Sequence, residues 1–370
     1  MKEKQKLLVI AGGDYIFGAE KVTLDVIEGL RNEGYNVAAI ISGWGDGKFA
    51  KVLDHLEVKF YKLKLGWYYL SKLLWSLDSL IHYPGALFRF LRLRKNFKDW
   101  PVYIISFRQV ILLWPFFRKN IVYHVHDVNS KSRQSRFFLR IIDKKVVKYI
   151  AVSNFIRQDL VNCGISSVKI DVIHNGIAIT NENTSKLLKG EMLTIGVVGQ
   201  IIARKGHDTI IEALDLLNKR GLKIQLIIAG SGNPKYIALL KKNIENSNLN
   251  KLVTWRGFTY DLKDIYEGID ILVAPTISAE PFGLIAIEAN MFSIPVIASN
   301  AGGFKETIKE GFNGFLVSVK NPIQIADKIE YFYFNRDQVS KMGNNGRDNA
   351  RQYFDKKTMI KKIENLITNL

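Results

Sequence analysis

Residues 271–300 read ILVAPTISAEPFGLIAIEANMFSIPVIASN. The apolar run at the start is typical of a strand. After a loop, apolar residues at 284, 285, 287 and 291 are typical of a helix, and the β-branched run at the end is typical of a second strand. Runs that are apolar throughout indicate parallel strands buried on both faces. The stretch therefore predicts a βαβ unit, with Glu280 at the turn before the helix and Pro281 in its first positions.

Two glutamates in this stretch need a chemical reason. Glu288 falls on a helix that other structure mostly covers, where a carboxylate is unfavourable unless it accepts hydrogen bonds. The helix start beside Glu280 carries backbone N–H groups without intrahelical partners, and such an end favours phosphate. The alternative is a capping Glu280 and an exposed Glu288.

The alternation of strands and helices extends to both sides of this stretch. The predicted strands are LLVIAGG (7–13), YNVAAIIS (35–42), VYIISF (102–107), NIVYHVHD (120–127) and KYIAVS (148–153), then TIGVVGQI (194–201), KIQLIIAGSG (223–232), KLVTWRGF (251–258), ILVAPT (271–276), PVIASN (295–300) and NGFLV (313–317). Helical stretches separate them. The predicted fold is therefore α/β, with two Rossmann-like doubly wound domains whose carboxyl edges face a central cleft.

The length of 370 residues also favours two domains, because one hydrophobic core rarely grows so large. We predict a first domain at 1–178, a polar linker at 179–191, a second domain at 192–352 and a C-terminal helix at 353–370. Ligands of such sheets bind outside the carboxyl ends of the strands.

The charge is unevenly distributed. The net charge is +18, and residues 1–185 hold 28 of the 53 Lys and Arg but only 16 of the 35 Asp and Glu, so +12 of it lies there. A basic excess favours phosphate-bearing partners. The single cysteine, Cys163, excludes an internal disulfide and is expected to be a buried thiol. The first apolar run is too short for a signal peptide and no run of 18 apolar residues occurs, so we expect a cytoplasmic protein.

The segment 60–119 is dense in aromatic, leucine and basic residues. Basic side chains among Trp, Tyr and Leu on helices suit the headgroup region of an anionic bilayer, so we expect peripheral contact with the inner face of the cell membrane. The alternative is a pair of core helices with solvated basic faces. We expect no nucleic-acid binding, because no nucleic-acid module surrounds the segment.

Arg204 and Lys205 follow the predicted strand 194–201, and a helix begins near His207. A strand end, two cations and a helix start together favour a diphosphate. The alternative is a solvated pair of surface cations.

His124 and His126 lie two apart in YHVHD. Residues two apart on a strand point the same way, so either could face the cleft, and His126 beside Asp127 is the better candidate. A buried structural histidine is the alternative. A zinc site would need further ligands, and no third histidine follows at the required spacing, so we predict no metal.

Glycine turns end two of the predicted strands. Gly230 and Gly232 follow one strand, but Lys235 stands where a dinucleotide fingerprint needs a third glycine. Gly12, Gly13 and Gly18 follow the first strand, before a helix that begins near residue 19. We interpret these turns as places where a phosphate-rich ligand approaches the backbone.

These residues resemble the retaining nucleotide-sugar glycosyltransferases of the two-Rossmann GT-B type, in glycosyltransferase family 4. The resemblance covers nearly the whole second half. It rests there on Glu280 and Glu288 as the E-x7-E pair and on the stretches KG (205–206), AGSG (229–232), WRGF (255–258), SNAGGFKE (299–306) and NGFL (313–316). The first half matches through FGAEK (17–21), HVHD (124–127), AVSNF (151–155) and VIHNGI (172–177).

The resemblance implies roles for these residues. Glu280 would hold hydroxyls of the donor sugar, Glu288 would bind the ribose, and Lys205 would stabilise the departing diphosphate. The expected catalytic residues are Glu280, Lys205 and His126. The expected donor-binding residues are Gly18, Arg204, Lys205, Gly232, Phe258, Pro281, Phe282, Gly283, Leu284 and Glu288. Gln200 departs from the family, where arginine is common, and Phe17 stands where glycine is common.

The resemblance further implies retention at the anomeric carbon, a UDP-sugar as co-substrate and no metal or other cofactor. The C-terminal helix would cross back to the first domain. The basic first half suggests a glycan or lipid-linked acceptor at a membrane, as in bacterial surface polysaccharide synthesis. Two other functions remain open: a nucleotide-sugar epimerase and a non-catalytic protein that binds sugar nucleotides.

Overall fold

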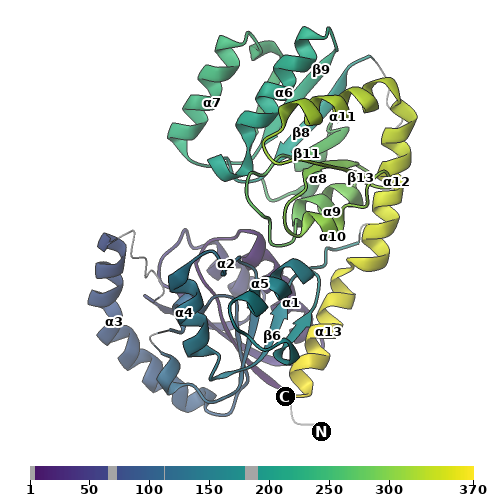
Figure 1. Ribbon diagram of the computed structural model, residues 1–370. Helices are drawn as coiled ribbons and strands as arrows, with labels where there is room; N and C mark the ends of the chain where they lie inside the picture. Colours follow the sequence, from purple (N-terminus) through teal and green to yellow (C-terminus); the bar gives the residue numbers. More distant parts are fainter. Residues whose placement is uncertain (1–4, 66–72, 112, 180–190) are drawn as a thin grey trace. The chain divides into compact units, whose positions relative to one another are not determined.

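The computed structural model describes residues 5–65, 73–111, 113–179 and 191–370 (Figure 1). The chain divides into two compact units. The first unit is Met1–Gly176 with Lys356–Leu370, and the second unit is Ile177–Asp355. Each unit holds one parallel sheet with helices between its strands, so the prediction of two Rossmann-like doubly wound domains is confirmed.

The sheet of the first unit has seven strands in the order β3-β2-β1-β4-β5-β6-β7. Every neighbouring pair is parallel. The strands are β1 Lys6–Ile10, β2 Asn36–Ser42, β3 Lys59–Leu63, β4 Val102–Ile104, β5 Ile121–Val125, β6 Val146–Ala151 and β7 Ile170–Val172. The order reverses between β1 and β4, which is the switch point where such sheets bind ligands.

Two of these strands are missing from the sequence prediction. They are β3 and β7, and both lie at an edge of the sheet. Each buries only one of its residues, Leu63 in β3 and Ile170 in β7. An edge strand with so little burial lacks the continuous apolar run that identifies a central strand.

Helices alternate with the strands of the first unit in the described part of the chain. The α-helices are α1 Gly18–Asn32, α2 Lys48–His55, α3 Leu73–Arg94, α4 Arg133–Ile142, α5 Asn154–Asn162 and α13 Lys356–Thr368. Four short 3-10 helices, η1 Lys95–Phe97, η2 Phe107–Gln109, η3 Trp114–Phe116 and η4 Ser167–Lys169, complete the set.

The C-terminal helix α13 packs on α1 within the first unit (Figure 1). A Cβ added to Gly29 would lie 2.4 Å from Ile360, so glycine allows the two helices to touch. Lys356 binds Asp25 at 3.0 Å and Glu28 at 3.2 Å on α1. An apolar contact and an ion-pair network therefore hold α13 in place.

The sheet of the second unit has six parallel strands in the order β10-β9-β8-β11-β12-β13. The strands are β8 Leu193–Val198, β9 Ile224–Ala229, β10 Val253–Gly257, β11 Ile271–Ala274, β12 Val296–Ser299 and β13 Gly314–Val317. All six lie within the predicted runs or extend them by one residue.

Helices cover both faces of this sheet. The helices are α6 His207–Lys219, α7 Pro234–Asn246, α8 Leu262–Tyr266, α9 Leu284–Met291, α10 Phe304–Thr307, α11 Pro322–Phe334 and α12 Arg336–Tyr353, with 3-10 turns η5 Ala203–Lys205 and η6 Asn250–Leu252. Successive residues of β11 enter different cores: Ile271 packs with α6, α7 and α11, and Leu272 packs with α8, α9 and α10. Burial on both faces explains why the strand is apolar throughout.

The described residues of the segment 60–119 form one α-helix, α3, and three short 3-10 helices, so the alternative of a pair of core helices is not found in that part of the chain. The segment also contains the central strand β4, whose three residues are all buried. Residues 66–72 and 112 of this segment, and residues 180–190 of the predicted linker, lie outside the described residues. Within the described ranges, every helix is too short or too polar to cross a lipid bilayer.

Candidate functional site

The candidate site of the second unit is built from two loops that follow β8 and β11. The first loop ends in η5, and Gly206 then turns the chain into α6 with φ of 70°. A Cβ at Gly206 would lie 2.0 Å from the carbonyl oxygen of Pro275, in the second loop. Only glycine allows this close approach, and glycine adopts the left-handed conformation without strain, so the two loops touch at their backbones.

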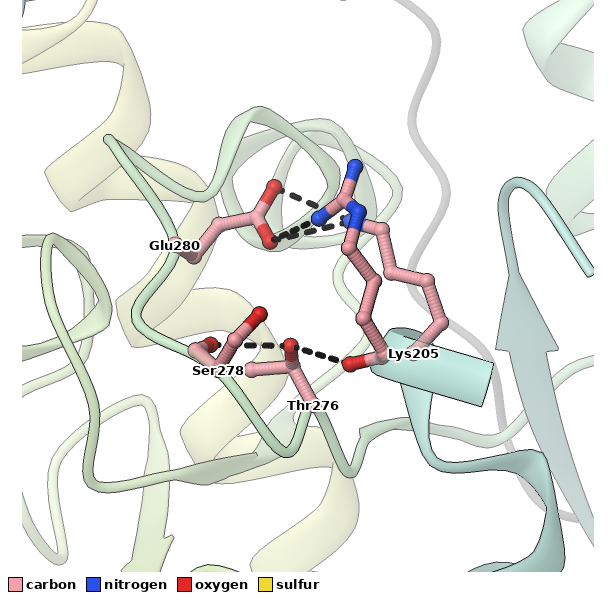
Figure 2. Close-up of polar contacts among 5 residues, drawn as sticks. Lys205, Thr276, Ser278 and Glu280 are labelled. Carbon is pink, nitrogen blue, oxygen red and sulfur yellow. Dashed lines mark hydrogen bonds and ion pairs between the residues drawn. The ribbon is translucent and has the colours of Figure 1, made fainter. Parts of the chain in front are cut away.

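Side-chain and backbone hydrogen bonds hold the same two loops together. The Thr276 hydroxyl lies 3.0 Å from the carbonyl oxygen of Arg204 and 3.0 Å from that of Ser278 (Figure 2). The backbone N–H of Ile277 donates to the same Arg204 carbonyl at 2.9 Å. The positions of Arg204 and Lys205 relative to the second loop are therefore fixed by contacts that need no ligand.

Lys205 and Glu280 form an ion pair across these loops (Figure 2). The Lys205 ammonium donates to the two carboxylate oxygens of Glu280 at 2.9 and 3.0 Å, and the two side chains are only 15% and 16% exposed. The Arg204 guanidinium lies 3.7 Å from the same carboxylate. Both cations thus converge on Glu280, where an anionic ligand would meet two positive charges and one negative charge.

The helix that carries Glu288 begins later than the sequence predicts. Pro281 lies in the loop before α9, and Gly283, with φ of 93°, is the residue that precedes Leu284. A Cβ at Gly283 would lie 2.5 Å from the ring of Phe304, so the site requires glycine. The prediction that Pro281 occupies the first helical positions is wrong, because the left-handed turn at Gly283 postpones the helix.

Glu280 is anchored through its backbone. Its carbonyl oxygen accepts from the N–H of Gly303 at 2.7 Å, and a Cβ at Gly302 would lie 2.2 Å from that carbonyl oxygen. The loop after β12 therefore supports the loop after β11. This support fixes the direction in which the Glu280 side chain leaves the backbone.

Glu288 is buried, with 6% of its surface exposed. Its carboxylate accepts a hydrogen bond of 3.2 Å from the Tyr266 hydroxyl, which also lies 3.2 Å from the carbonyl oxygen of Ile285. Burial raises the pKa of Tyr266, so the hydroxyl keeps its proton and remains a donor. The alternative of an exposed Glu288 is wrong.

The glycine turns after β8 and β9 contact one another. A Cβ at Gly230 would lie 1.9 Å from the carbonyl oxygen of Gly199, and one at Gly232 would lie 2.0 Å from that of Ile201. The need for glycine here comes from a neighbouring loop of the protein. Phe258, after β10, is 49% exposed, and its ring meets Tyr260 edge-on at 4.7 Å.

The first unit contains the two other predicted site residues, Gly18 and His126. Gly18 begins α1, with open space where a Cβ would lie. His126 follows β5 and is half-buried, and its Nε2 is an inaccessible atom without a partner in the described part of the chain. Burial lowers the pKa of His126 to about 3, so the imidazole is neutral at pH 7.

His124 has a structural role. It is fully buried, and its Nδ1 forms a short hydrogen bond with the Tyr103 hydroxyl. The alternative that His124 faces a ligand is therefore wrong. Its ring lies 4.1 Å from that of His126, and the residues that the structure describes contain no group of three His, Cys, Asp or Glu placed to hold a metal ion.

Two family models together span most of the chain. The model for Glycosyl transferases group 1 matches residues 179–349, and the model for Glycosyltransferase Family 4 matches residues 16–181. The chain belongs to the family 4 glycosyltransferases. The family predicted from the motifs is confirmed, and the two model matches meet close to the boundary between the two units.

The relatives of this chain include a phosphatidylinositol monomannoside mannosyltransferase and a capsular polysaccharide biosynthesis glycosyltransferase. It is 29% identical over 167 residues to the GDP-mannose-dependent alpha-(1-6)-phosphatidylinositol monomannoside mannosyltransferase of Mycobacterium tuberculosis, covering 43% of each chain. It is 25% identical over 255 residues to the capsular polysaccharide biosynthesis glycosyltransferase CapM of Staphylococcus aureus, covering 62% of this chain and 65% of CapM. Both matches span less than two thirds of the relative.

A solved structure shares the fold over the whole chain. The crystal structure of Anabaena Alr3699/HepE in complex with UDP-glucose superposes with a TM-score of 0.80 at 21% identity, covering 99% of this chain and 100% of the other. The GT-B architecture of two Rossmann-like units is thereby confirmed.

Two contributors to the site escaped the sequence prediction. Thr276 closes the predicted strand ILVAPT, and a polar residue at the carboxyl end of a buried strand is a signal that could have identified it. Tyr266 lies 22 residues before Glu288 in a short helix of five residues. No periodicity marks it, so its contact with Glu288 needed the structure.

Proposed function

We propose that this glycosyltransferase transfers a sugar from a nucleoside diphosphate sugar, with UDP-sugar as the donor, to a glycan or lipid-linked acceptor in bacterial surface polysaccharide synthesis. The observation that carries the proposal is the half-buried pair of Lys205 and Glu280 at the carboxyl edge of the second sheet. A cation and a carboxylate in contact can bind a phosphate and the hydroxyls of a sugar side by side.

The charges of the site suit a leaving diphosphate. Negative charge grows on the diphosphate when the glycosidic bond breaks, and Lys205, with Arg204 nearby, would offset it. Because the Glu280 carboxylate already offsets part of the Lys205 charge, the ligand must share the ammonium with Glu280. Preorganised charge of this kind lowers the barrier without reorganisation during the reaction.

We propose further donor contacts around α9. Backbone N–H groups at the start of α9, near Phe282, Gly283 and Leu284, would lie against the sugar and phosphate. Glu288 would accept hydrogen bonds from the ribose hydroxyls, since one of its oxygens is already oriented by Tyr266. A buried carboxylate that accepts from hydroxyls is chemically reasonable, whereas an isolated one is unfavourable.

We propose retention by a front-face displacement that needs no metal. The acceptor hydroxyl attacks the anomeric carbon, the bond to the diphosphate oxygen breaks, and this oxygen takes the hydroxyl proton. Protein groups then supply position and charge stabilisation. His126 is neutral at pH 7 and would contribute a hydrogen bond to a sugar hydroxyl, since an imidazole with a pKa of about 3 is a poor proton source.

We also propose that the first unit contacts an anionic membrane. Leu77, Ile81 and Phe88 recur on one side of α3 and are 48%, 75% and 69% exposed. Exposed apolar residues on a helix that ends in Arg92 and Arg94 suit the headgroup region of a bilayer. Flotation with phosphatidylcholine vesicles should increase when phosphatidylglycerol is added; equal flotation with and without the anionic lipid would contradict this proposal.

The transfer proposal is tested with a panel of UDP- and GDP-sugars and a membrane extract as acceptor. We expect release of UDP. NMR compares the anomeric configuration of donor and product, and retention predicts that the two are the same. Glu280→Gln should lower turnover by about 10²-fold or more. Glu267→Gln, an exposed carboxylate in the same unit, is the matched control and should leave turnover unchanged.

Other outcomes would point to the alternative functions. Conversion of the donor sugar without release of UDP or GDP would identify an epimerase. Nucleotide binding without turnover of any donor would identify a binding protein. Parent activity in Glu280→Gln would contradict the proposed site.

A further inference from the structure

A second candidate site, lined by basic residues and apolar surface, lies in the first unit between the end of β3 and α3. A pocket of about 360 Å³ opens there. The α3 wall consists of His82, Gly85, Ala86 and Arg89, whose spacing of three and four places them on one face of the helix. Lys62 and Lys64 form the wall on the side of the sheet.

The lining of this pocket has a positive balance. Lys62 is paired with Asp14 at 2.7 Å, so its charge is offset. The ammonium of Lys64 lies 3.2 Å from Nε2 of His82, and Asp78 lies 3.5 Å from the same nitrogen. Arg89 has no carboxylate within 4.0 Å among the residues that the structure describes. Lys64 and Arg89 therefore leave positive charge in the pocket for an anion.

Two glycines shape the pocket. Gly85 is exposed and lines the pocket, and a Cβ added there would meet nothing within 4 Å, so a larger side chain fits at this position without a clash. Glycine inside a helix costs about 0.5–1 kcal/mol of stability relative to alanine. A pocket that binds a ligand would explain why glycine occurs at this position. A Cβ at Gly43 would lie 2.8 Å from Cγ of Lys64, so glycine lets the loop after β2 pack against the stem of Lys64.

The pocket adjoins the exposed apolar side of α3. Leu77 and Ile81 each precede a polar residue of the pocket side, Asp78 and His82, and Phe88 precedes Arg89. Adjacent positions on a helix are about 100° apart, so the two faces are neighbours. A ligand with an anionic group in the pocket could lay an apolar chain along Leu77, Ile81 and Phe88.

We propose that this pocket binds phosphate groups of the acceptor, which is then a lipid phosphate or diphosphate. The inference rests on the proposed transfer function and names the class of its acceptor. Lys64 and Arg89 would donate to the phosphate oxygens, because charge-assisted hydrogen bonds are the strong contacts to such groups. The open space at Gly85 would admit the phosphate, and the apolar face of α3 would hold the lipid.

Calorimetric titration of the full chain with inorganic pyrophosphate tests the pocket. Saturating UDP is present, so that the proposed donor site is filled. We expect the double variant Lys64→Gln/Arg89→Gln to lose about tenfold or more in pyrophosphate affinity. Arg92→Gln, which removes an exposed charge of α3 outside the pocket, should keep parent affinity. Equal affinity in the double variant and the parent would overturn the proposal.

Gly85→Leu tests the same pocket without changing a charge. The leucine would fill space that is open in the parent, so the fold should persist and pyrophosphate affinity should fall about tenfold or more. Gln158→Leu, which places a leucine at an exposed position of α5 in the same unit, is the control and should bind pyrophosphate like the parent.

Vesicles of phosphatidylcholine that contain phosphatidic acid test whether the phosphate in the pocket belongs to a lipid or is free in solution. Flotation that is reduced by Gly85→Leu and by added pyrophosphate supports a lipid phosphate in the pocket. If Gly85→Leu weakens pyrophosphate binding but leaves flotation unchanged, the lipid part of the proposal is overturned. UDP titration of the same variants should match the parent, so a failure of the donor site is seen separately.

Discussion

At the carboxyl edge of the second unit's sheet, the candidate site residues Lys205, Glu280 and Glu288 already contact partners, whereas at the same edge of the first unit the candidate site residue His126 has a buried nitrogen without a partner among the described residues. Lys205 pairs with Glu280, and Tyr266 donates to Glu288. In contrast, Nε2 of His126 and Oε1 of Gln109 are buried and unsatisfied. The comparison indicates that the charged candidate residues of the second edge are organised without a ligand.

The largest expected effect comes from breaking the organised edge at its cation. Lys205→Met keeps a long side chain but removes the charge, and we expect turnover to fall by about 10²–10³-fold because the leaving diphosphate loses its partner. Steady-state kinetics on UDP release is the measurement. Lys219→Met, an exposed lysine on α6 in an i,i+4 pair with Asp215, should retain parent turnover. A similar loss in both variants would contradict a specific role for Lys205.

Glycines at the two edges should respond differently to alanine. Gly206→Ala introduces a left-handed alanine and a contact of 2.0 Å with a backbone oxygen, and we expect a loss of about 3 kcal/mol in the free energy of unfolding. Gly18→Ala meets open space and should change it by less than about 0.5 kcal/mol. Urea unfolding measures both. Equal effects would show that the second edge is no more tightly packed than the first.

The buried histidine of the second unit predicts a pH effect on stability. Burial lowers the pKa of His207 to about 4, and both ring nitrogens lack partners within the described ranges. Below pH 6.5 the unfolded chain takes up a proton that the folded chain does not, so the free energy of unfolding falls as the pH decreases from 6.5 towards 4. The loss from His207 at pH 5 should be about 2 kcal/mol.

His207→Leu removes this proton uptake and so measures the contribution of His207 to the pH dependence of stability. The drop in unfolding free energy between pH 7 and pH 5 should be about 2 kcal/mol smaller in the variant than in the parent. The remainder belongs to other groups, including His124 and His126 of the first unit, whose pKa values burial also lowers. An unchanged drop would mean that water or protein groups already satisfy His207.

The smallest effect is expected from the hydrogen bond behind Glu288. Tyr266→Phe removes the donor and keeps the ring, and we expect a loss of about 1–2 kcal/mol in unfolding free energy because the carboxylate loses a buried partner. UDP affinity should fall a fewfold if Tyr266 orients Glu288 for the ribose. Calorimetry with UDP measures this fall. Tyr353→Phe, an exposed tyrosine on α12, is the control.

The sequence was most informative where both faces of a strand are covered. All six strands of the second unit were predicted, because two helical layers require each of them to be apolar throughout. Edge strands β3 and β7 were missed, since Lys59–Leu63 and Ile170–Val172 bury too little for a pattern to appear. The start of α9 was misplaced because the conformation of Gly283 depends on the ring of Phe304.

The sequence predicted which residues form the candidate site, but it did not predict which of these residues contact one another. Glu280 and Lys205 were identified by motif resemblance, yet their contact joins residues 75 apart and needed the fold. The resemblance also led to Glu288, while its donor Tyr266 has no sequence signal. The close approach of loops at Gly206 and Gly232 could not be predicted, because it depends on carbonyl oxygens that belong to other segments.

The place of α13 has a consequence for synthesis on the ribosome. The first unit is completed by Lys356–Thr368, yet the whole second unit, Ile177–Asp355, is translated in between. At roughly 5–20 residues per second, the nascent first unit waits roughly 10–40 s with the α1 surface around Gly29 uncovered. The second unit, which is continuous in sequence, can fold during that interval, so chaperones that shield apolar surface should associate with the earlier half of the nascent chain.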